Sequence, residues 1–242
     1  MLGASLNIAG PTATLNTIVA EELRKFADKL ESAEDFDVAL NRLIRHTLRD
    51  HRRIIFGGNG YSKEWIEEAK RRGLSNYATT ADVLPHFNDK KFVELYTRHG
   101  IYTAQEMRSR QEISLLSYGS TVRIEAKTMV DMVRHGYLPA IGRYTAELDR
   151  ALQLTGSKAK RKTFDILIKL EDRAFDLVTE LEELVASVTV ANYSDSEKFA
   201  RVLCDSVIPV MTALREVIDE AERYMPKADW PYPTYGDLMF NN

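Results

Sequence analysis

Cysteine is almost absent from this 242-residue sequence, which contains one, Cys204. A single cysteine cannot form a disulfide within the chain, and chains without disulfides are typical of reducing compartments. The residues beside Cys204 carry no positive charge that would favour its thiolate form, so we expect a buried structural thiol rather than a nucleophile. The sequence therefore predicts a cytoplasmic protein.

Long apolar runs are also missing. No stretch approaches the roughly 18 residues that suggest a membrane span, and the first residues do not combine a basic region with an apolar one, as a secretion signal does. Neither sign of charge predominates, because 33 Lys and Arg stand against 36 Asp and Glu, a formal net charge of −3. Without a positive balance, nucleic acid is a poor candidate. We expect neither a membrane nor nucleic acid as a partner.

A long helical pattern occupies the middle of the chain, over 103–154. Thr103 and Glu106 have the spacing of a capping box, in which two side chains satisfy backbone N–H groups of the first turn. Apolar residues then recur every three or four positions, the period of a helix face, and a second apolar set suggests that the helix is packed on more than one side. Because Pro139 lacks an N–H and its ring crowds the preceding turn, we expect a bend at about 136–139.

The remaining apolar stripes predict an all-α fold. We expect an antiparallel bundle of long, kinked helices, with shorter helices packed at one end, whose core is built by helices at about 104–153, 160–190 and 195–225. A turn at Asn192-Tyr193-Ser194 and a cap at Ser194 should precede the last of them. The residues predicted to be buried are Leu15, Ile18, Val19, Leu23, Phe26, Ala27 and Leu30, then Phe36, Leu40, Leu43, Ile44, Thr47 and Leu48, then Phe164, Leu167, Ala174, Phe175, Val178, Leu181, Val185 and Val188, and finally Phe199, Leu203, Val207, Val210, Leu214, Val217, Ile218 and Ala221.

A basic cluster marks the end of the second helix. It consists of Arg45, His46, Arg49, His51, Arg52 and Arg53. Positive charge near a helix C-terminus is favourable, so a solvated helix end accounts for it. An anion site or a subunit contact is the alternative.

A glycine-rich stretch, 57–60, follows this cluster. Its three glycines permit positive φ and close backbone approach. The Lys-Ser/Thr pair and the glycine spacing of nucleotide loops are missing, so we expect a tight structural turn. Ser62 should then cap the helix that ends at Gly73.

The search for catalytic chemistry assigns no residue. No histidine has a glutamate three positions before it, which a di-iron bundle requires. Asp131 and His135 lie four residues apart on one helix face, the spacing of a surface ion pair or of two metal ligands, and the ion pair is the better account. We therefore assign no catalytic, cofactor-binding or metal-ligating residue in this chain.

The tail, 230–240, is aromatic and proline-rich. Its exposed apolar area would be costly in water, since burying one such side chain is worth roughly 1.5–3 kcal/mol. We expect Trp230, Tyr232, Tyr235, Leu238 and Phe240 to dock as a clasp, either on this chain or on a neighbouring subunit.

Four strings of residues carry a family resemblance. The segments 2–21, 52–65 (Arg-Arg-Ile-Ile-Phe-Gly-Gly-Asn-Gly-Tyr-Ser-Lys-Glu-Trp), 124–129 and 230–238 (Trp-Pro-Tyr-Pro-Thr-Tyr-Gly-Asp-Leu) are similar to stretches in the C-terminal part of type III glutamine synthetases. The resemblance implies two domains here, namely 1–56 as closing helices of the catalytic domain and 57–242 as the type III C-terminal helical domain.

The resemblance also implies what the parent enzyme does. Glutamine synthetases are glutamate–ammonia ligases of nitrogen assimilation that use ATP and two or three Mg²⁺ or Mn²⁺ ions, and type III members form stacked hexameric rings. Their metal and ATP ligands lie before the segment that begins at Met1, so we expect this segment alone to be inactive and to contribute assembly or regulatory structure. The alternative is a stand-alone α-helical interaction module without enzymatic activity.

Overall fold

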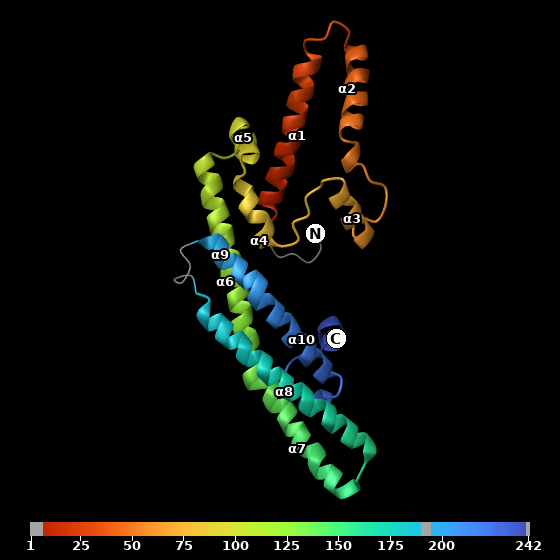
Figure 1. Ribbon diagram of the computed structural model, residues 1–242, viewed down its shortest axis with the longest axis vertical. Helices are drawn as coiled ribbons and strands as arrows, with labels where there is room; N and C mark the ends of the chain where they lie inside the picture. Colours follow the sequence, from red (N-terminus) through yellow and green to blue (C-terminus); the bar gives the residue numbers. More distant parts are fainter. Residues whose placement is uncertain (1–6, 190–194, 241–242) are drawn as a thin grey trace. The chain divides into compact units, whose positions relative to one another are not determined.

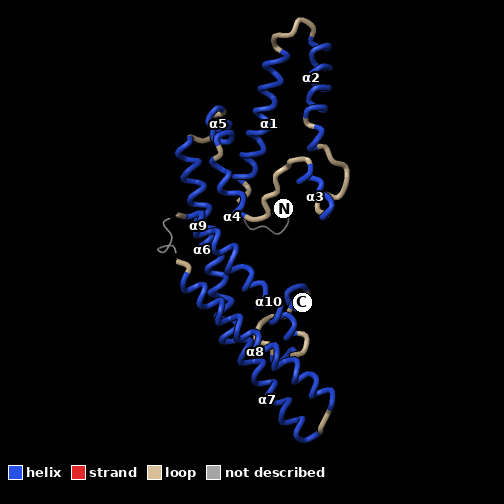
Figure 2. Tube along the Cα trace, in the orientation of Figure 1, coloured by secondary structure: helices blue, strands red, loops and turns tan. Residues whose placement is uncertain are grey.

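The computed structural model describes residues 7–189 and 195–240, and every regular element in these ranges is helical (Figures 1 and 2). The predicted all-α fold is therefore confirmed. The predicted turn at Asn192-Tyr193-Ser194 and the Ser194 cap lie outside the described residues. The elements are α1 (Ala9–Leu30), α2 (Phe36–Asp50), η1 (Arg52–Ile54), α3 (Lys63–Arg71), α4 (Thr80–Val83), η2 (Leu84–Asn88), α5 (Lys90–Arg98), α6 (Ala104–Met132), η3 (Val133–Tyr137), α7 (Leu138–Thr155), α8 (Lys158–Ser187), α9 (Ser196–Val202), η5 (Leu203–Val207), α10 (Ile208–Glu222), η6 (Lys227–Asp229) and α11 (Tyr235–Met239).

The chain divides into two compact units, Met1–Gln111 and Glu112–Asn242. The first contains the α1–α2 hairpin and the shorter helices α3, α4 and α5. The second contains most of α6 and the long helices that follow. No described helix is long and apolar enough to cross a membrane. The predicted domain boundary at residue 56 comes from the family resemblance, whereas this division comes from the compactness of the structure. The domain boundary therefore stays a prediction.

Local sequence signals place the helix ends correctly. The Thr103–Glu106 capping box forms, with the Thr103 N–H donating to Glu106 Oε2 at 2.7 Å and the Glu106 N–H to Thr103 Oγ1 at 3.2 Å. Gly73 and Gly100 follow α3 and α5 with φ of 71° and 64°. In both cases the next residue's N–H reaches back five residues to a helix carbonyl, which completes a Schellman motif.

The predicted burial of α1 and α2 is wrong for most of their apolar residues. In α1, Leu15, Val19 and Leu23 are 57–64% exposed, and the buried residues are Thr17 and Glu21. In α2 no residue is buried, and Phe36 and Leu48 are more than half exposed. The periodicity that predicted a buried face identified an apolar face correctly, but the described residues cover little of it.

The glycine-rich stretch contains the predicted tight turn, in which the Ser62 N–H donates to the Asn59 carbonyl at 3.3 Å, but none of its glycines is among the described residues with φ above zero. Its requirement for glycine lies at Gly58, where an added Cβ would lie 2.7 Å from the ring of Phe56. Phe56 stacks on Trp65 of α3 at 3.8 Å between ring centroids. The Ser62 cap is confirmed, since its Oγ accepts the Trp65 N–H at 3.2 Å. Glycine at position 58 therefore leaves room for the ring of Phe56, which stacks on Trp65.

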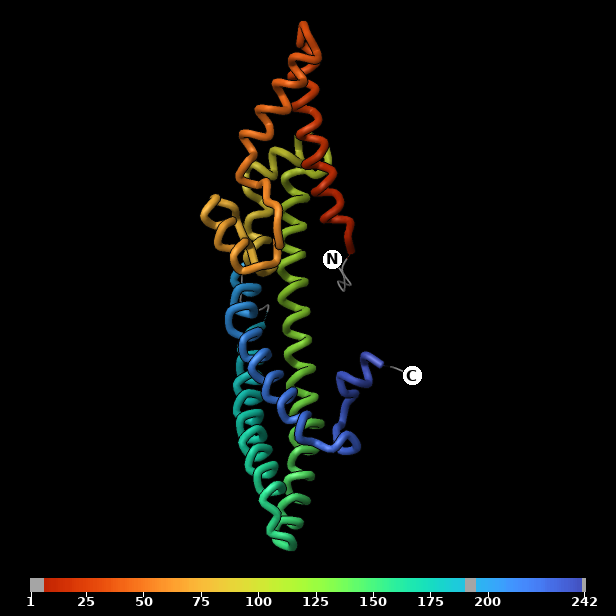
Figure 3. The backbone as a smooth tube through the Cα atoms, turned by 90° about the vertical axis from the view of Figure 1, so that its right-hand side faces the viewer, coloured from red at the N-terminus to blue at the C-terminus, as the bar shows by residue number. Residues whose placement is uncertain are grey.

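The second unit is an antiparallel helical bundle. α8 packs against both α7 and α10, which run beside it in Figures 1 and 3. Its predicted face is buried except at Phe164, which is half-buried, and Phe175, which is 53% exposed. The Arg134 guanidinium lies over the Phe175 ring, 5.0 Å from its centroid. Leu167, Val178 and Leu181 of α8 form the middle of the core.

Two of the three long helical runs in this unit, α6–α7 and α9–α10, contain a π turn before a proline. Helical structure is continuous from α6 through η3 to α7, and in η3 the Leu138 N–H bonds to the Val133 carbonyl, five residues back. η5 repeats this before Pro209, with the Ile208 N–H on the Leu203 carbonyl. A π turn over 133–137 thus lies where the bend at about 136–139 was predicted. The second apolar set of α6 is partly uncovered, since Ile113 and Ile124 are each 65% exposed.

The tail docks on the η3 turn of its own unit, and Figure 3 shows the chain turning back after α10. Trp230 is 7% exposed, and the rings of Trp230 and Tyr232 lie 4.7 and 4.9 Å from that of Tyr137. Gly136 makes room for Tyr232, because an added Cβ would lie 2.5 Å from its ring. The predicted clasp thus forms through Trp230 and Tyr232. Leu238 and Phe240, which are 68% and 74% exposed, do not dock on this chain, and docking on a neighbouring subunit stays a prediction for them.

Replacement of Trp230 by alanine tests this clasp. Removing a buried aromatic side chain typically costs about 3–5 kcal/mol, so Trp230→Ala should lower the free energy of unfolding by an amount in this range and speed proteolysis within 231–240. Phe240→Ala is the matched control in the same tail and should leave both unchanged. Equal effects of the two substitutions in urea unfolding would contradict the clasp.

Candidate functional site

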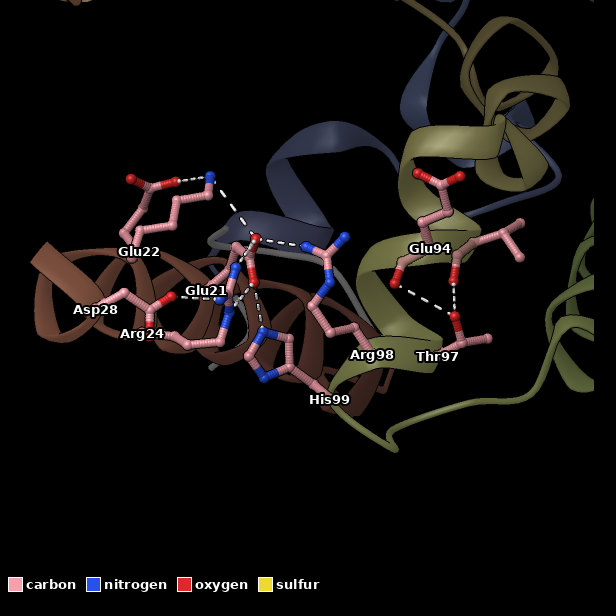
Figure 4. Close-up of polar contacts among 10 residues, drawn as sticks. Glu21, Glu22, Arg24, Asp28, Glu94, Thr97, Arg98 and His99 are labelled. Carbon is pink, nitrogen blue, oxygen red and sulfur yellow. Dashed lines mark hydrogen bonds and ion pairs between the residues drawn. The ribbon is translucent and has the colours of Figure 1, made fainter.

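A buried carboxylate joins α1 to α5 in the first unit. Glu21 is 6% exposed, and Figure 4 shows its carboxylate between the side chains of Arg24, Arg98 and His99. Arg98 Nη1 donates to Oε1 at 2.6 Å, and His99 Nε2 lies 2.8 Å from Oε2. Arg24 donates from Nε at 3.2 Å and from Nη2 at 3.1 Å. We call these four residues the Glu21 cluster.

The surrounding donors hold Glu21 ionised. Hydrogen bonds from Arg24 and His99, helped by the charges of Arg24 and Arg98, lower the pKa of Glu21 to about 2 although burial acts the other way. A carboxylate with so low a pKa is a poor base at neutral pH, so the Glu21 cluster does not suit acid–base catalysis. It is a structural junction that positions α1 on α5.

A second polar feature, which we call the arginine pocket, lies where η1 meets the end of α3. It is a hollow of about 630 Å³ lined by Arg52, Arg53, Ile55, Glu68, Arg71 and Arg72. Glu68 accepts a two-bond fork from Arg71, at 2.7 Å each, and a bond from Arg72 Nε at 2.6 Å. These bonds lower the pKa of Glu68 to about 2, Arg71 contributing more than Arg72. The pocket therefore holds one ionised carboxylate among four guanidinium groups.

An apolar groove lies between α6 and α10 in the second unit, beside the η3 turn. Its volume is about 470 Å³, and Tyr235 of the tail and Arg215 of α10 stand among its lining residues. Met129, Met132 and Met211 give it a flexible, polarisable surface.

The remaining candidates occupy separate places. Asp131 and His135 form an ion pair at 2.9 Å with both side chains about three-quarters exposed, which supports the surface ion pair. Cys204 is half-buried. Over 7–189 and 195–240, no three His, Cys, Asp or Glu side chains gather in a group that could hold a metal ion.

The predicted basic cluster is divided by the structure. Arg45, His46 and Arg49 line an open hollow along α2, whereas Arg52 and Arg53 belong to the arginine pocket. The sequence showed these arginines as one run. It gave no sign that Arg71 and Arg72 stand opposite two of them.

The Glu21 cluster predicts a specific dependence of stability on pH. Since the pKa of Glu21 is lowered from 4.5 to about 2 by folding, its contribution is complete above about pH 4.5 and is lost as the pH falls toward 2. Glu21→Gln should lower the melting temperature at pH 7, and the difference from the unaltered chain should shrink between pH 4.5 and 2. Glu22→Gln, whose carboxylate pairs with Lys25 on the surface, is the control and should change little. A Glu21→Gln effect that is constant across this range would contradict the ionised junction.

Comparison with known proteins identifies the family. Residues 39–155 match the family model of the glutamine synthetase C-terminal domain. A glutamine synthetase of Butyrivibrio fibrisolvens is 31% identical over 87% of this chain and 31% of its own length. A type-3 glutamine synthetase of Dictyostelium discoideum is 29% identical over 99% of this chain and 34% of its own length.

A third relative, a glutamine synthetase of Bacteroides fragilis (strain YCH46), is 27% identical over 98% of this chain and 34% of its own length. The chain thus spans about a third of the length of these curated relatives. It belongs to the glutamine synthetase family, and one of these relatives is a type-3 member. Residues 39–155 carry that family's C-terminal domain.

Proposed function

We propose that this chain is the C-terminal segment of a glutamate–ammonia ligase, to which it contributes assembly structure rather than catalytic ligands. In this proposal the whole enzyme is a cytoplasmic homo-oligomer of stacked hexameric rings that converts glutamate, ammonia and ATP to glutamine. Residues 1–56 close its catalytic domain, and 57–242 form the type III helical domain. The family membership supports the enzyme class, and the surface of α1 supports the role in assembly.

The observation that carries the assembly role is an uncovered apolar stripe on α1. It consists of Leu15, Ile18, Val19 and Leu23, which are 64%, 47%, 57% and 61% exposed. Their spacing puts them on one face, and an apolar helix face normally packs against another protein surface. Since full burial of one such side chain is worth roughly 1.5–3 kcal/mol, covering four of them favours association by several kcal/mol. We call this surface the α1 stripe.

The proposal that other parts of the enzyme supply the catalytic ligands follows from the chemistry of phosphoryl transfer. Mg²⁺ or Mn²⁺ ions would neutralise the phosphates of ATP and promote attack by the glutamate carboxylate, which requires carboxylate and histidine ligands grouped within a few ångströms. The described part of this chain has no such group of three side chains. In our proposal the metal and ATP ligands therefore come from the rest of the synthetase, and the 242-residue chain alone does not catalyse ATP-dependent glutamine formation.

Charge placed on the α1 stripe tests the assembly role. Val19 and Leu23 are exposed in this chain, so Val19→Asp/Leu23→Asp should leave its melting temperature within about 2 °C of the unaltered value, as exposed substitutions usually do. In the complete synthetase the same pair should reduce ring assembly, measured by light scattering after size exclusion, together with glutamine formation. Leu154→Asp, at a position that is 86% exposed outside the stripe, is the control and should leave assembly unchanged.

Two results would contradict this function. If the double substitution left ring assembly and activity of the complete synthetase intact, the α1 stripe would not be an assembly surface. If the chain on its own showed ATP- and Mg²⁺-dependent glutamine formation that a mock preparation lacks, catalytic ligands would have to lie within it.

A further inference from the structure

We propose that the arginine pocket is a binding site for a polyphosphate anion, either free or as the phosphate chain of a nucleotide. This site is separate from the α1 stripe and does not depend on the assembly role. Four guanidinium groups and one carboxylate line the pocket, so three positive charges are uncompensated there. The chain as a whole is slightly acidic, with a net charge of −3, which makes this local excess a distinct feature.

The far wall of the pocket is held rigidly. Arg72 donates from Nε to Glu68 and from Nη1 to the carbonyls of Arg53 and Ile55, at 3.2 and 3.0 Å. Its guanidinium also lies 5.4 Å from the ring centroid of Trp65. These bonds tie the end of α3 to η1 and fix the position of the positive charge. Little further side-chain entropy is therefore lost when an anion binds to this wall.

Enough donors remain for a ligand. Arg71 uses Nε and Nη2 for Glu68, which leaves Nη1, and Arg72 uses Nε and Nη1, which leaves Nη2. Within the described residues, the side chains of Arg52 and Arg53 make no ion pair or hydrogen bond, and both are exposed. The planar fork of arginine matches two phosphate oxygens at once. Arg52 and Arg53, whose forks are unengaged, thus line the same hollow as the fixed wall, and a chain of phosphates would use both.

The charge and size of the pocket favour a polyphosphate over smaller anions. Its volume of about 630 Å³ exceeds what a single phosphate or carboxylate fills. A monocarboxylate would also leave two of the three positive charges uncompensated, whereas a di- or triphosphate balances all of them. Glu68 does not compete for the remaining donors, because it accepts from Nε and Nη2 of Arg71 and from Nε of Arg72 only.

A second basic hollow in the same unit provides an internal control. Arg42, Arg45, His46 and Arg49 line it, but all four come from α2, together with Asp37 of the same helix. Arg42 and Arg45 have no fixed wall opposite them on a second element. A site that depends on a fixed wall should therefore use Arg52 and Arg53, which share the pocket with Arg72, and be indifferent to Arg42 and Arg45.

Titration calorimetry on the full 242-residue chain with inorganic tripolyphosphate tests the proposal, at constant ionic strength and without added metal ion. We expect saturable binding of one anion per chain. Arg52→Gln/Arg53→Gln should weaken it by about tenfold or more, as expected for the loss of charge-assisted hydrogen bonds. Arg42→Gln/Arg45→Gln removes the same charge and should change the affinity less than about twofold if simple charge attraction is not the cause. Circular dichroism melting confirms that each variant is folded.

Further arms distinguish the source of the phosphates and the alternatives. If ATP binds no more tightly than tripolyphosphate, the pocket is a site for free polyphosphate. If ATP binds more tightly, the ligand is a nucleotide. Both results support the proposal. Arg52→Lys/Arg53→Lys keeps the charge but not the fork and should weaken binding by a smaller factor than the glutamine pair. The proposal is overturned if no saturable binding occurs, if both glutamine pairs weaken it equally, or if a poly-glutamate peptide competes as well as tripolyphosphate, since the surface would then dock an acidic protein.

Discussion

A proline within a helix has no N–H to donate, and the second unit is organised around this constraint at Pro139 and Pro209. In both helices a π turn precedes the proline, at η3 and at η5, and absorbs the missing bond without ending the helix. The wider turn at η3 contains Gly136, and the absence of a side chain there admits Tyr232 of the tail. The C-terminal clasp is thus seated on the turn that precedes Pro139. Met132 at the end of α6 and Val133 at the start of η3 line the groove beside this turn.

In the first unit, a charged residue of α1 is buried while its apolar residues are exposed. Along α1 the apolar residues Leu15, Val19 and Leu23 face outward, while Glu21 is buried against α5. A buried charge is tolerated only when it is paired, and Arg24, Arg98 and His99 provide the pairing. A short helix such as α5 has little apolar area to offer, so this ionic junction orients α1 and leaves its apolar face available. The two sides of α1 thus have different roles, one to hold the unit together and one to meet another surface.

Local signals in the sequence predicted most of the fold. The helix at 103–154, its capping box and the irregularity near Pro139 all depend on residues within a turn of one another, and all are present. The glycines after α3 and α5 are likewise placed by their own φ. The burial of α1 and α2 could not be predicted in this way, because periodicity identifies an apolar face without saying what covers it. Phe175 illustrates the same limit, since Arg134 covers its ring and no core does.

The sequence could not predict the candidate sites, because residues that are far apart in the chain form them. The pairing of Glu21 with Arg24 has the i,i+3 spacing of a helix and was visible, but Arg98 and His99 lie 77 and 78 residues away. The arginine pocket requires that the end of α3 return to η1, which depends on Arg72 reaching the carbonyls of Arg53 and Ile55. This contact between separate segments is part of the tertiary structure. The spacing of Arg52 and Arg53 in the sequence therefore cannot predict it.

The family match adds a distinction between the two surfaces of the first unit. It covers residues 39–155, which include the whole arginine pocket and end at the last residue of α7, but not the α1 stripe. The pocket therefore lies within the glutamine synthetase C-terminal domain as the family model defines it, whereas the stripe precedes that domain. An apolar stripe outside the domain suits the proposed contact between subunits. A rigid, positively charged hollow inside the domain suits a ligand that the domain itself would recognise, so assembly and recognition can reside on one unit without sharing a residue.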